Sequence, residues 1–264
     1  MSKNIPSILI IAGSDSVGAS GLQADIKSTT SNGVYASSAL TSVVAENTLG
    51  VQKFFPLEYG IIKQQIDSVL SDIRVDVIKT GIIFGVDGVN AVYDGIKDYL
   101  NKIPLVFDPV IVSSTTGEPL FDNSVLTLMK EKLLVNCFIT APNKEEAELL
   151  CDCKISNIDD AINACRKLCE LGAKNAVVKS ITVDDKKICN VLVTSENQVF
   201  IFKKKLLNIG LINGGGCTFA STLASFLAKK LSVEKSVKRA TDYTWDTINN
   251  SFKLGAGFNV LKHF

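Results

Sequence analysis

Apolar, β-branched runs alternate with helical patterns along this chain, and the alternation is the strongest constraint on its fold. Most of the apolar runs are continuous, which is typical of strands buried on both faces. They occupy residues 7–13, 75–83, 103–112, 135–143, 174–180, 188–194 and 198–204. Helical patterns occupy residues 21–31, 58–72, 87–101, 122–134, 144–151, 158–171 and 217–230. The alternation predicts an α/β protein with a mainly parallel central sheet and helices on both sides.

The chain shows no sign of a boundary between domains. No Gly-, Pro- or Ser-rich linker interrupts it, and its 264 residues are 46% hydrophobic, which is enough for one large core. We therefore predict a single domain over residues 1–264. Several strand runs end in polar or Gly-bearing loops, namely "GSDSVGASG", "KTG", "DPV" and "APNKEE". Ligands bind beyond the carboxyl ends of parallel strands, so these loops indicate one shared crevice.

The charge balance argues against polyanionic partners. Lys and Arg number 28 against 27 Asp and Glu, which gives a net charge of +1. We expect no nucleic-acid partner and no membrane association, because both favour a basic excess. The chain also lacks a signal-peptide pattern and an apolar stretch of membrane-spanning length. These features predict a soluble, cytoplasmic protein whose seven cysteines are reduced thiols.

Three consecutive glycines open the last helical pattern, in "NGGGCTFA" at residues 213–220. A helix N-terminus presents unpaired N–H groups and the positive end of the helix dipole. Glycines there allow an anion to approach the backbone closely, so the pattern favours a phosphate cradle over a merely flexible loop. The segment is neither a Walker loop nor a dinucleotide-binding fingerprint, because the required spacings are missing.

Histidine and cysteine chemistry is weakly indicated. His263 is the only histidine, which excludes His-based catalytic triads. Cys151 with Cys153, and Cys165 with Cys169, raise the possibility of a four-thiolate metal site. Their spacings match no zinc module, however, and the simpler interpretation is that they are small buried side chains.

Five stretches in this order resemble one family across nearly the whole chain: "IAGSDSVGASGLQADIK", "AENTLGVQ", "DPVIVSSTTGEPL", "APNKEEAELL" and "NGGGCT". The chain is similar to the hydroxymethylpyrimidine/phosphomethylpyrimidine kinases of thiamine biosynthesis, within the ribokinase-like superfamily. The resemblance implies a three-layer α/β/α fold, use of ATP and Mg²⁺, and a homodimer. It also implies phosphorylation of a pyrimidine hydroxymethyl group, followed by a second phosphorylation to the pyrophosphate.

The resemblance also implies roles for particular residues. The anion hole would comprise Gly214, Gly215, Gly216 and Cys217, with Cys217 beside the attacking hydroxyl either as a thiolate or as a neutral spacer. The pyrimidine would be bound by Gly13, Ser20, Asp25, Glu46 and Val110, with Asp25 meeting the hydroxyl.

On the nucleotide side, the resemblance assigns Asp108 and Lys179 to the ATP phosphates. It assigns Asp108 to Mg²⁺ as well, and it has Asn143 and Glu146 act on the metal through water. The residues alone favour function most clearly for Asp108, which follows the apolar run "PLVF" directly. For the other three residues a simpler interpretation is available without the resemblance. Asp25 would be a solvated residue on a helix, Glu146 part of an acidic helix start, and Lys179 a lysine whose apolar stem is buried.

The chain departs from the family pattern at several positions. Glu46 replaces the Gln that pairs with the pyrimidine edge, and an ionised carboxylate cannot donate to the ring nitrogen. Either Glu46 is protonated in the pocket, or the substrate or its protonation state differs. The usual "KGGH" is here "KSIT" at 179–182, Asn213 replaces a histidine, and Gly215 and Ser20 replace Thr and Ala.

Two further hypotheses remain open at this point. The first is a pyridoxal kinase of the cysteine-bearing branch, although the segment "VSSTTGEP" after "DPV" lacks the cysteine often found there. The second is a non-catalytic member that binds a vitamin or a nucleotide, which the altered "KSIT" and Glu46 suggest.

Overall fold

A nine-stranded sheet forms the centre of the molecule, in a computed structural model that describes residues 5–111, 120 and 122–264. The strands are β1 Ser7–Asp15, β2 Tyr35–Asn47, β3 Gly50–Pro56, β4 Val77–Thr80, β5 Leu105–Phe107, β6 Ile139–Thr140, β7 Ala176–Asp184, β8 Lys187–Val193 and β9 Val199–Lys205. Their order is β3-β2-β1-β4-β5-β6-β7-β8-β9. The pairings from β2 to β7 are parallel, and those of β3, β8 and β9 are antiparallel.

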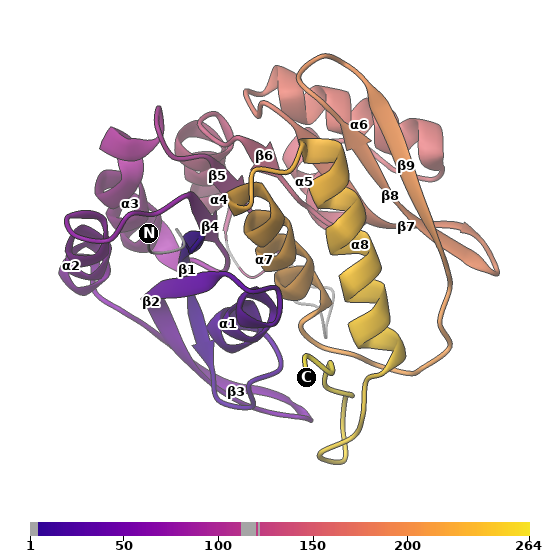
Figure 1. Cartoon of the computed structure of the whole chain (residues 1–264), viewed down its shortest axis with the longest axis horizontal. Coiled ribbons are helices and arrows are strands. Elements are labelled where there is room, and N and C mark those ends of the chain that lie inside the picture. The colour runs from indigo at the N-terminus through magenta and orange to yellow at the C-terminus, as the bar shows by residue number, and fades with distance from the viewer. Residues whose placement is uncertain (1–4, 112–119, 121) are drawn as a thin grey trace.

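Helices cover both faces of this sheet (Figure 1). They are α1 Gly21–Ser31, α2 Tyr59–Leu70, α3 Gly85–Ile96, α4 Asn123–Met129, α5 Lys144–Cys151, α6 Ile158–Glu170, α7 Gly215–Ala228 and α8 Val233–Asn249, with short turns η1 Lys97–Tyr99 and η2 Lys130–Leu134. Helices α1, α7 and α8 lie on one face and α2 to α6 on the other. The predicted α/β architecture with a mainly parallel sheet and two helical layers is therefore confirmed.

Strand β1 shows why the sequence forms a three-layer core. Its residues Ile8, Leu9, Ile10 and Ile11 are all fully buried. Successive side chains of a strand point to opposite faces, and here Leu9 and Ile11 pack toward α2–α6 while Ile8 and Ile10 pack toward α1, α7 and α8. Each such side chain contributes about 1.5–3 kcal/mol by leaving water. A continuous apolar run is therefore stable only between two layers of helices.

The chain order reverses between β1 and β4. Strand β1 leads to β2 on one side, and the chain then returns to place β4 on the other side of β1. The loops beyond the carboxyl ends of these two strands consequently diverge, and such a divergence is where open α/β sheets bind ligands.

Three elements were not predicted from the sequence. Strand β2 alternates between buried and exposed residues and lies beside the exposed edge strand β3, so neither forms a continuous apolar run. Helix α8 is amphipathic but polar overall. Three predicted strands are shorter than expected, since 75–83 contains only β4, 103–112 only β5 and 135–143 only β6. The assignment of residues 1–264 to one domain stays a prediction.

A segment that follows α8 ties two distant parts of the fold together. The Phe258 N–H donates to the Thr48 carbonyl (2.8 Å), in the turn between β2 and β3. The next residue, Asn259, donates its N–H to the Leu211 carbonyl (2.9 Å), just before α7. A Cβ at Gly257 would lie within 1.7 Å of the Thr48 oxygen, so only glycine fits this contact. We call residues 257–260 the strap.

No helix in the described part of the chain is long and apolar enough to cross a membrane.

Candidate active site

A cavity of about 640 Å³ lies beyond the carboxyl ends of the central strands. One half is bordered by β1, β2 and β3, and the other by β8, β9 and α8; the glycines of α7 lie between them. Twelve predicted site residues line it: Gly13, Ser20, Glu46, Asp108, Val110, Asn143, Glu146, Lys179, Gly214, Gly215, Gly216 and Cys217. The structure therefore brings together residues that are up to about 200 positions apart in the sequence.

The start of α7 is an open set of backbone donors. Gly214, the N-cap, has φ +90°, and no side chain caps the helix. A Cβ at Gly214 would lie 1.8 Å from the Ala19 carbonyl oxygen, so this position requires glycine. A Cβ at Gly215 would meet nothing closer than 3.7 Å, which leaves space in front of the first turn. The helix dipole and the N–H groups of this turn fit a phosphoryl anion there.

Charged groups of alternating sign lie behind the glycines. Lys179 Nζ donates to Asp108 Oδ1 (2.8 Å), and a Cβ at Gly216 would lie 3.5 Å from the same ammonium. The second lysine, Lys79, is fully buried at the end of β4; its Nζ donates to Asp25 Oδ2 (2.7 Å) and lies 4.0 Å from Asp108 Oδ2. Of the two lysines, Lys179 thus has its ammonium close to the first turn of α7.

Lys79 was missed by the sequence interpretation. Burial alone would lower its pKa, but the nearby charge of Asp25 and the other acidic groups raises it, so the ammonium stays charged. The signal was a lysine inside the apolar run "VDVIKTG", where an unpaired charge is very costly. A lysine in such a place implies a buried anionic partner.

Asp25 is the one predicted site residue that does not line the cavity. Its side chain is completely buried on α1 and bound to Lys79, and burial raises its pKa to about 6 against the effect of that ammonium. The structure therefore does not support a direct contact between Asp25 and the substrate hydroxyl. It acts on the site through its pair with Lys79 and through its charge, which adds to the rise in the pKa of Cys217.

Cys217 lies in the first turn of α7 and is half-buried. Burial raises the pKa of its thiol to about 12, with Lys79 acting in the opposite direction and Asp25 and Asp108 adding to the rise. Desolvation outweighs the opposing charge of Lys79, so the structure favours a neutral thiol over a thiolate.

Asn143 and Glu146 form a capping box at the start of α5. Glu146 N–H donates to Asn143 Oδ1, and Asn143 N–H donates to Glu146 Oε2, each at 2.9 Å. The other oxygen of Glu146 accepts from the Ile111 N–H (3.3 Å), and burial raises its pKa to about 7. With both oxygens occupied, Glu146 is suited to act on a metal through water.

The carboxyl oxygen Asp108 Oδ2 is different. It is buried and has no hydrogen-bond partner within the described residues. An unsatisfied carboxylate oxygen beside a phosphate cradle fits a Mg²⁺ ion, which prefers few carboxylates and completes its shell with water and phosphate oxygens. No cluster of three or more His, Cys, Asp or Glu side chains capable of holding a metal occurs among the described residues, so the proposed thiolate site is not found in that part of the chain.

Glu46 lies at the end of β2 in the other half of the cavity. Its Oε1 accepts from Asn213 Nδ2 (3.0 Å), which joins two of the positions that depart from the family pattern. Burial raises the pKa of Glu46 to about 7, and the neighbouring carboxyl of Asp15 adds to the rise. Asp15 was also missed by the sequence interpretation, although it lies within the quoted loop.

The opposite half of the cavity is lined by aromatic and polar side chains of β8, β9 and α8. Trp245 lies beside Lys204, whose ammonium is 5.2 Å from its ring centroid, and Phe202 lines the same half. Within the "KSIT" segment, Ser180 adopts φ +63° and its N–H donates to Asn190 Oδ1 (3.0 Å). Serine thus occupies a left-handed conformation that glycine adopts more readily, at a cost of about 1 kcal/mol.

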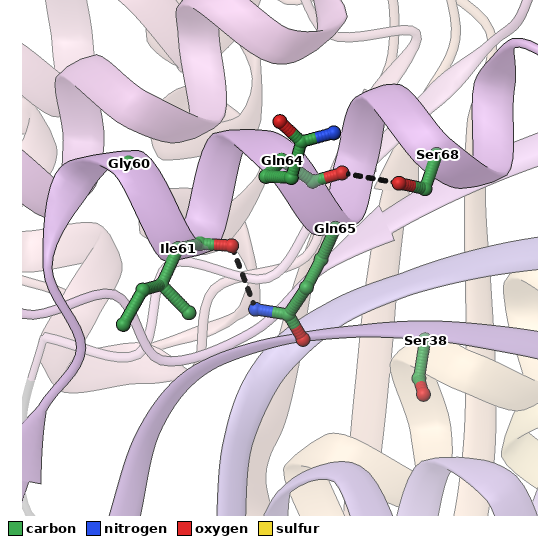
Figure 2. Close-up of a pocket in the computed structure, with 6 residues that line it drawn as sticks. All are labelled: Ser38, Gly60, Ile61, Gln64, Gln65 and Ser68. Atoms are coloured by element: carbon green, nitrogen blue, oxygen red, sulfur yellow. Dashed lines mark hydrogen bonds between the residues drawn. The ribbon is translucent and has the colours of Figure 1, made fainter.

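A second depression lies between α2 and β2 (Figure 2). Within it, Gln65 donates to the carbonyls of Ile61 and Leu40 and accepts from the Leu40 N–H, and Ser68 donates to the Gln64 carbonyl, so these polar groups are occupied within α2 and β2. None of its lining side chains is ionisable: they are Ser38, Gly60, Ile61, Gln64, Gln65 and Ser68. It lacks the charges that phosphoryl transfer requires.

Comparison with known proteins agrees with this geometry. The family model described as phosphomethylpyrimidine kinase matches residues 15–262. The chain belongs to the phosphomethylpyrimidine kinase family. A hydroxymethylpyrimidine/phosphomethylpyrimidine kinase of Bacillus subtilis is 34% identical, over 97% of this chain and 94% of that protein. As a member of this family the chain is a phosphotransferase.

Solved structures of similar proteins have the same ribokinase-like fold. The phosphomethylpyrimidine kinase of Clostridium difficile superposes with a TM-score of 0.80 and 30% identity, over 93% of this chain and 100% of that chain. An ADP complex of the Bacillus subtilis pyridoxal kinase gives a TM-score of 0.90 and 29% identity, over 98% of both chains. The fold is thus shared by proteins of two vitamin-kinase activities. The segment "VSSTTGEP", where pyridoxal kinases of the cysteine-bearing branch often have a cysteine, lies outside the described residues.

Proposed function

We propose that this phosphomethylpyrimidine kinase family member transfers the terminal phosphate of ATP to 4-amino-5-hydroxymethyl-2-methylpyrimidine and then to its monophosphate. The observation that carries the proposal is the position of the α7 glycines, which open into the cavity between its two halves. A hydroxyl in the β1–β3 half and a nucleotide in the β8–α8 half would meet at this helix start. Members of the same family carry the name of this activity.

The residues provide positioning and charge neutralisation, which are the main demands of phosphoryl transfer. The N–H groups of Gly215, Gly216 and Cys217 would hold the transferred phosphoryl group, and Lys179 would neutralise its developing charge. A neutral Cys217 thiol would shape the space for the hydroxyl instead of removing its proton. A loose transition state tolerates this, because the nucleophile loses its proton late.

The charged groups would divide the remaining roles. Asp108, with its unsatisfied oxygen, would hold Mg²⁺, with Glu146 acting through water and Asn143 fixing its orientation. When bound, the ion would neutralise charge on the phosphates. Lys79 would balance the carboxyl charges of Asp108 and Asp25 next to the site. Gly13, Ser20, Glu46 and Val110 would form the wall against the pyrimidine.

The proposal includes assembly and location. We expect a homodimer, as the family resemblance implies, and a cytoplasmic enzyme with access to ATP. Size-exclusion chromatography with light scattering measures the first, and a monomer at micromolar concentration would contradict it.

An ATP-consumption assay tests the activity. The protein is incubated with ATP, Mg²⁺ and the pyrimidine alcohol or its monophosphate, with pyridoxal as the parallel substrate. We expect turnover with both pyrimidines. Turnover with pyridoxal alone would replace this proposal by a pyridoxal kinase, a candidate favoured by the close structural match to such an enzyme. Ligand binding without any turnover would indicate a non-catalytic member.

A further inference from the structure

The loop between β9 and α7 is held by one residue of the strap. Asn259 donates its N–H to the Leu211 carbonyl (2.9 Å) and its Nδ2 to the Ile209 carbonyl (2.9 Å). Its own carbonyl accepts from the Asn213 N–H (3.4 Å). Asn259 thus binds the loop at three alternate positions, and the last of them directly precedes Gly214, the N-cap of α7.

The strap is also fixed to the turn between β2 and β3. Phe258 donates its N–H to the Thr48 carbonyl (2.8 Å), and Gly257 donates its N–H to Thr48 Oγ1 (3.3 Å). In Figure 1 the segment that follows α8 lies between the end of β3 and the loop that enters α7. The strap therefore joins the β1–β3 side of the cavity to the start of α7.

Apolar packing adds a third attachment. Phe258 and Val260 are 3% and 6% exposed and form a small cluster with Ala19, in the loop between β1 and α1. The Ala19 carbonyl oxygen is the atom that a Cβ at Gly214 would meet at 1.8 Å. The strap thus packs against the same residue that the N-cap of α7 contacts. Because no side chain caps α7, the position of its first turn depends on these neighbouring contacts.

We infer that Asn259 is a positioning residue for phosphoryl transfer, because through the strap it fixes the first turn of α7. The inference deepens the proposed function and rests on it, since that turn would hold the transferred phosphoryl group. Within the described part of the chain, Asn259 is not among the residues that line the cavity, so it acts through the loop that it holds. Backbone donors stabilise a developing charge only when they are held in place beforehand, and a misplacement of about 1 Å can cost about a hundredfold in rate.

This role predicts a particular kinetic effect. The N–H groups of the first turn would interact most strongly with the phosphoryl group during its transfer and less with bound ATP. A displaced turn should therefore lower kcat and leave the KM for ATP nearly unchanged. A merely structural role of the strap would lower Tm without this separation of kcat from KM.

Two strap variants test the inference in steady-state kinetics of pyrimidine phosphorylation. Asn259→Ala removes the side-chain bond to Ile209, and kcat should fall about fivefold, which corresponds to one neutral hydrogen bond. Gly257→Ala places a Cβ within 1.7 Å of the Thr48 carbonyl oxygen and should detach the strap from the turn, so kcat should fall about a hundredfold. Both variants should keep the KM for ATP within about twofold of the wild-type value. Asn259→Ala, which removes a single side-chain bond, decides the question if Gly257→Ala is too unstable to assay.

A mimic of the transition state gives a second measurement. ADP with aluminium fluoride and the pyrimidine alcohol imitates the phosphoryl group during transfer, and calorimetry measures its binding. In each variant its affinity should fall by about the same factor as kcat, whereas the affinity for ADP alone should stay unchanged.

Asn175→Ala is the matched control. Asn175 Nδ2 donates to the Phe138 carbonyl (2.8 Å), and its Oδ1 accepts from the Ser195 N–H (3.0 Å). Asn175 precedes β7, at the amino end of that strand, so it lies at the opposite end from the cavity. This variant also loses an asparagine that holds loop backbone. It should lower Tm at least as much as Asn259→Ala and leave kcat unchanged.

The outcomes separate this inference from the proposed function. Strap variants with wild-type kcat would refute the inference alone, and so would a loss of kcat that Asn175→Ala shares. Unchanged affinity of the variants for the transition-state mimic would refute it as well. Wild-type protein that neither phosphorylates the pyrimidine nor binds this mimic would refute the proposed function, and this inference with it.

Discussion

Replacing Lys79 by methionine removes the cation from the most deeply buried ion pair of the site. Lys79 and Asp25 are both fully buried, 2.7 Å apart. Methionine keeps most of the apolar volume but leaves the Asp25 carboxylate without its ammonium. Breaking a buried pair in this way costs about 3–5 kcal/mol. For a chain of this size, we expect Lys79→Met to lower Tm by about 6–20 °C.

The stability lost in Lys79→Met should depend on pH, because the variant changes the protonation of Asp25. Burial raises the pKa of Asp25 to about 6 even with Lys79 present, and removal of the ammonium raises it further. The folded variant then binds a proton that the unfolded chain releases, so its stability falls as pH rises. The difference in Tm between wild type and variant should therefore be small near pH 5 and widen above pH 6.

Differential scanning calorimetry measures these effects against two matched variants. Lys63→Met removes the cation of a partly exposed pair with Asp67 at 2.6 Å, and it should leave Tm close to that of the wild type because such pairs are screened by water. The double variant Asp25→Asn/Lys79→Met should recover most of the lost Tm. A Lys79→Met variant that loses no more stability than Lys63→Met would refute the argument that Lys79 neutralises a buried carboxylate.

Three further predictions concern the cavity. Gly214→Ala should lower Tm and reduce kcat by about a hundredfold, because its Cβ would collide with the Ala19 carbonyl and shift the start of α7. Gly215→Ala should keep a near-normal Tm, because a Cβ there has space. Equal Tm values for the two variants would contradict this argument. Alkylation of Cys217 by iodoacetamide, followed by mass spectrometry, should still accelerate with pH above 9, since its pKa is about 12; a plateau below pH 8 would reveal a thiolate. Asp108→Asn should raise the Mg²⁺ concentration needed for half-maximal activity, and an unchanged Mg²⁺ titration would exclude Asp108 as the metal-binding carboxylate.

Much of the fold could be predicted because the continuous apolar runs must be buried on both faces. A run such as Ile8–Ile11 is stable only between two helical layers, so the sandwiched sheet follows from the sequence. Strands β2 and β3 and helix α8 were missed because they lie at the margins of the core. Their patterns depend on which face happens to be covered, and only the folded structure decides that.

Only part of the candidate site could be predicted from the sequence. Glycines before a helix and an aspartate after an apolar run have local signatures, and the structure brings both to one cavity. The burial of Asp25, its pairing with Lys79, and the contact between Glu46 and Asn213 have no local signature. These contacts join residues 54 and 167 positions apart and depend on the packing of α1, β2 and α7. The roles assigned to these residues remain predictions.

The strap has a consequence for the order in which the site is completed during synthesis. Gly257 contacts Thr48, which lies 209 positions earlier in the chain, and its neighbours hold the approach to Gly214. A ribosome that has translated the entire sheet has therefore not yet made the residues that fasten the β2–β3 turn against this approach. A nascent chain would therefore form the β8, β9 and α8 side of the cavity before the β1–β3 side was secured, and the cavity would be complete only after residues 257–260 had emerged.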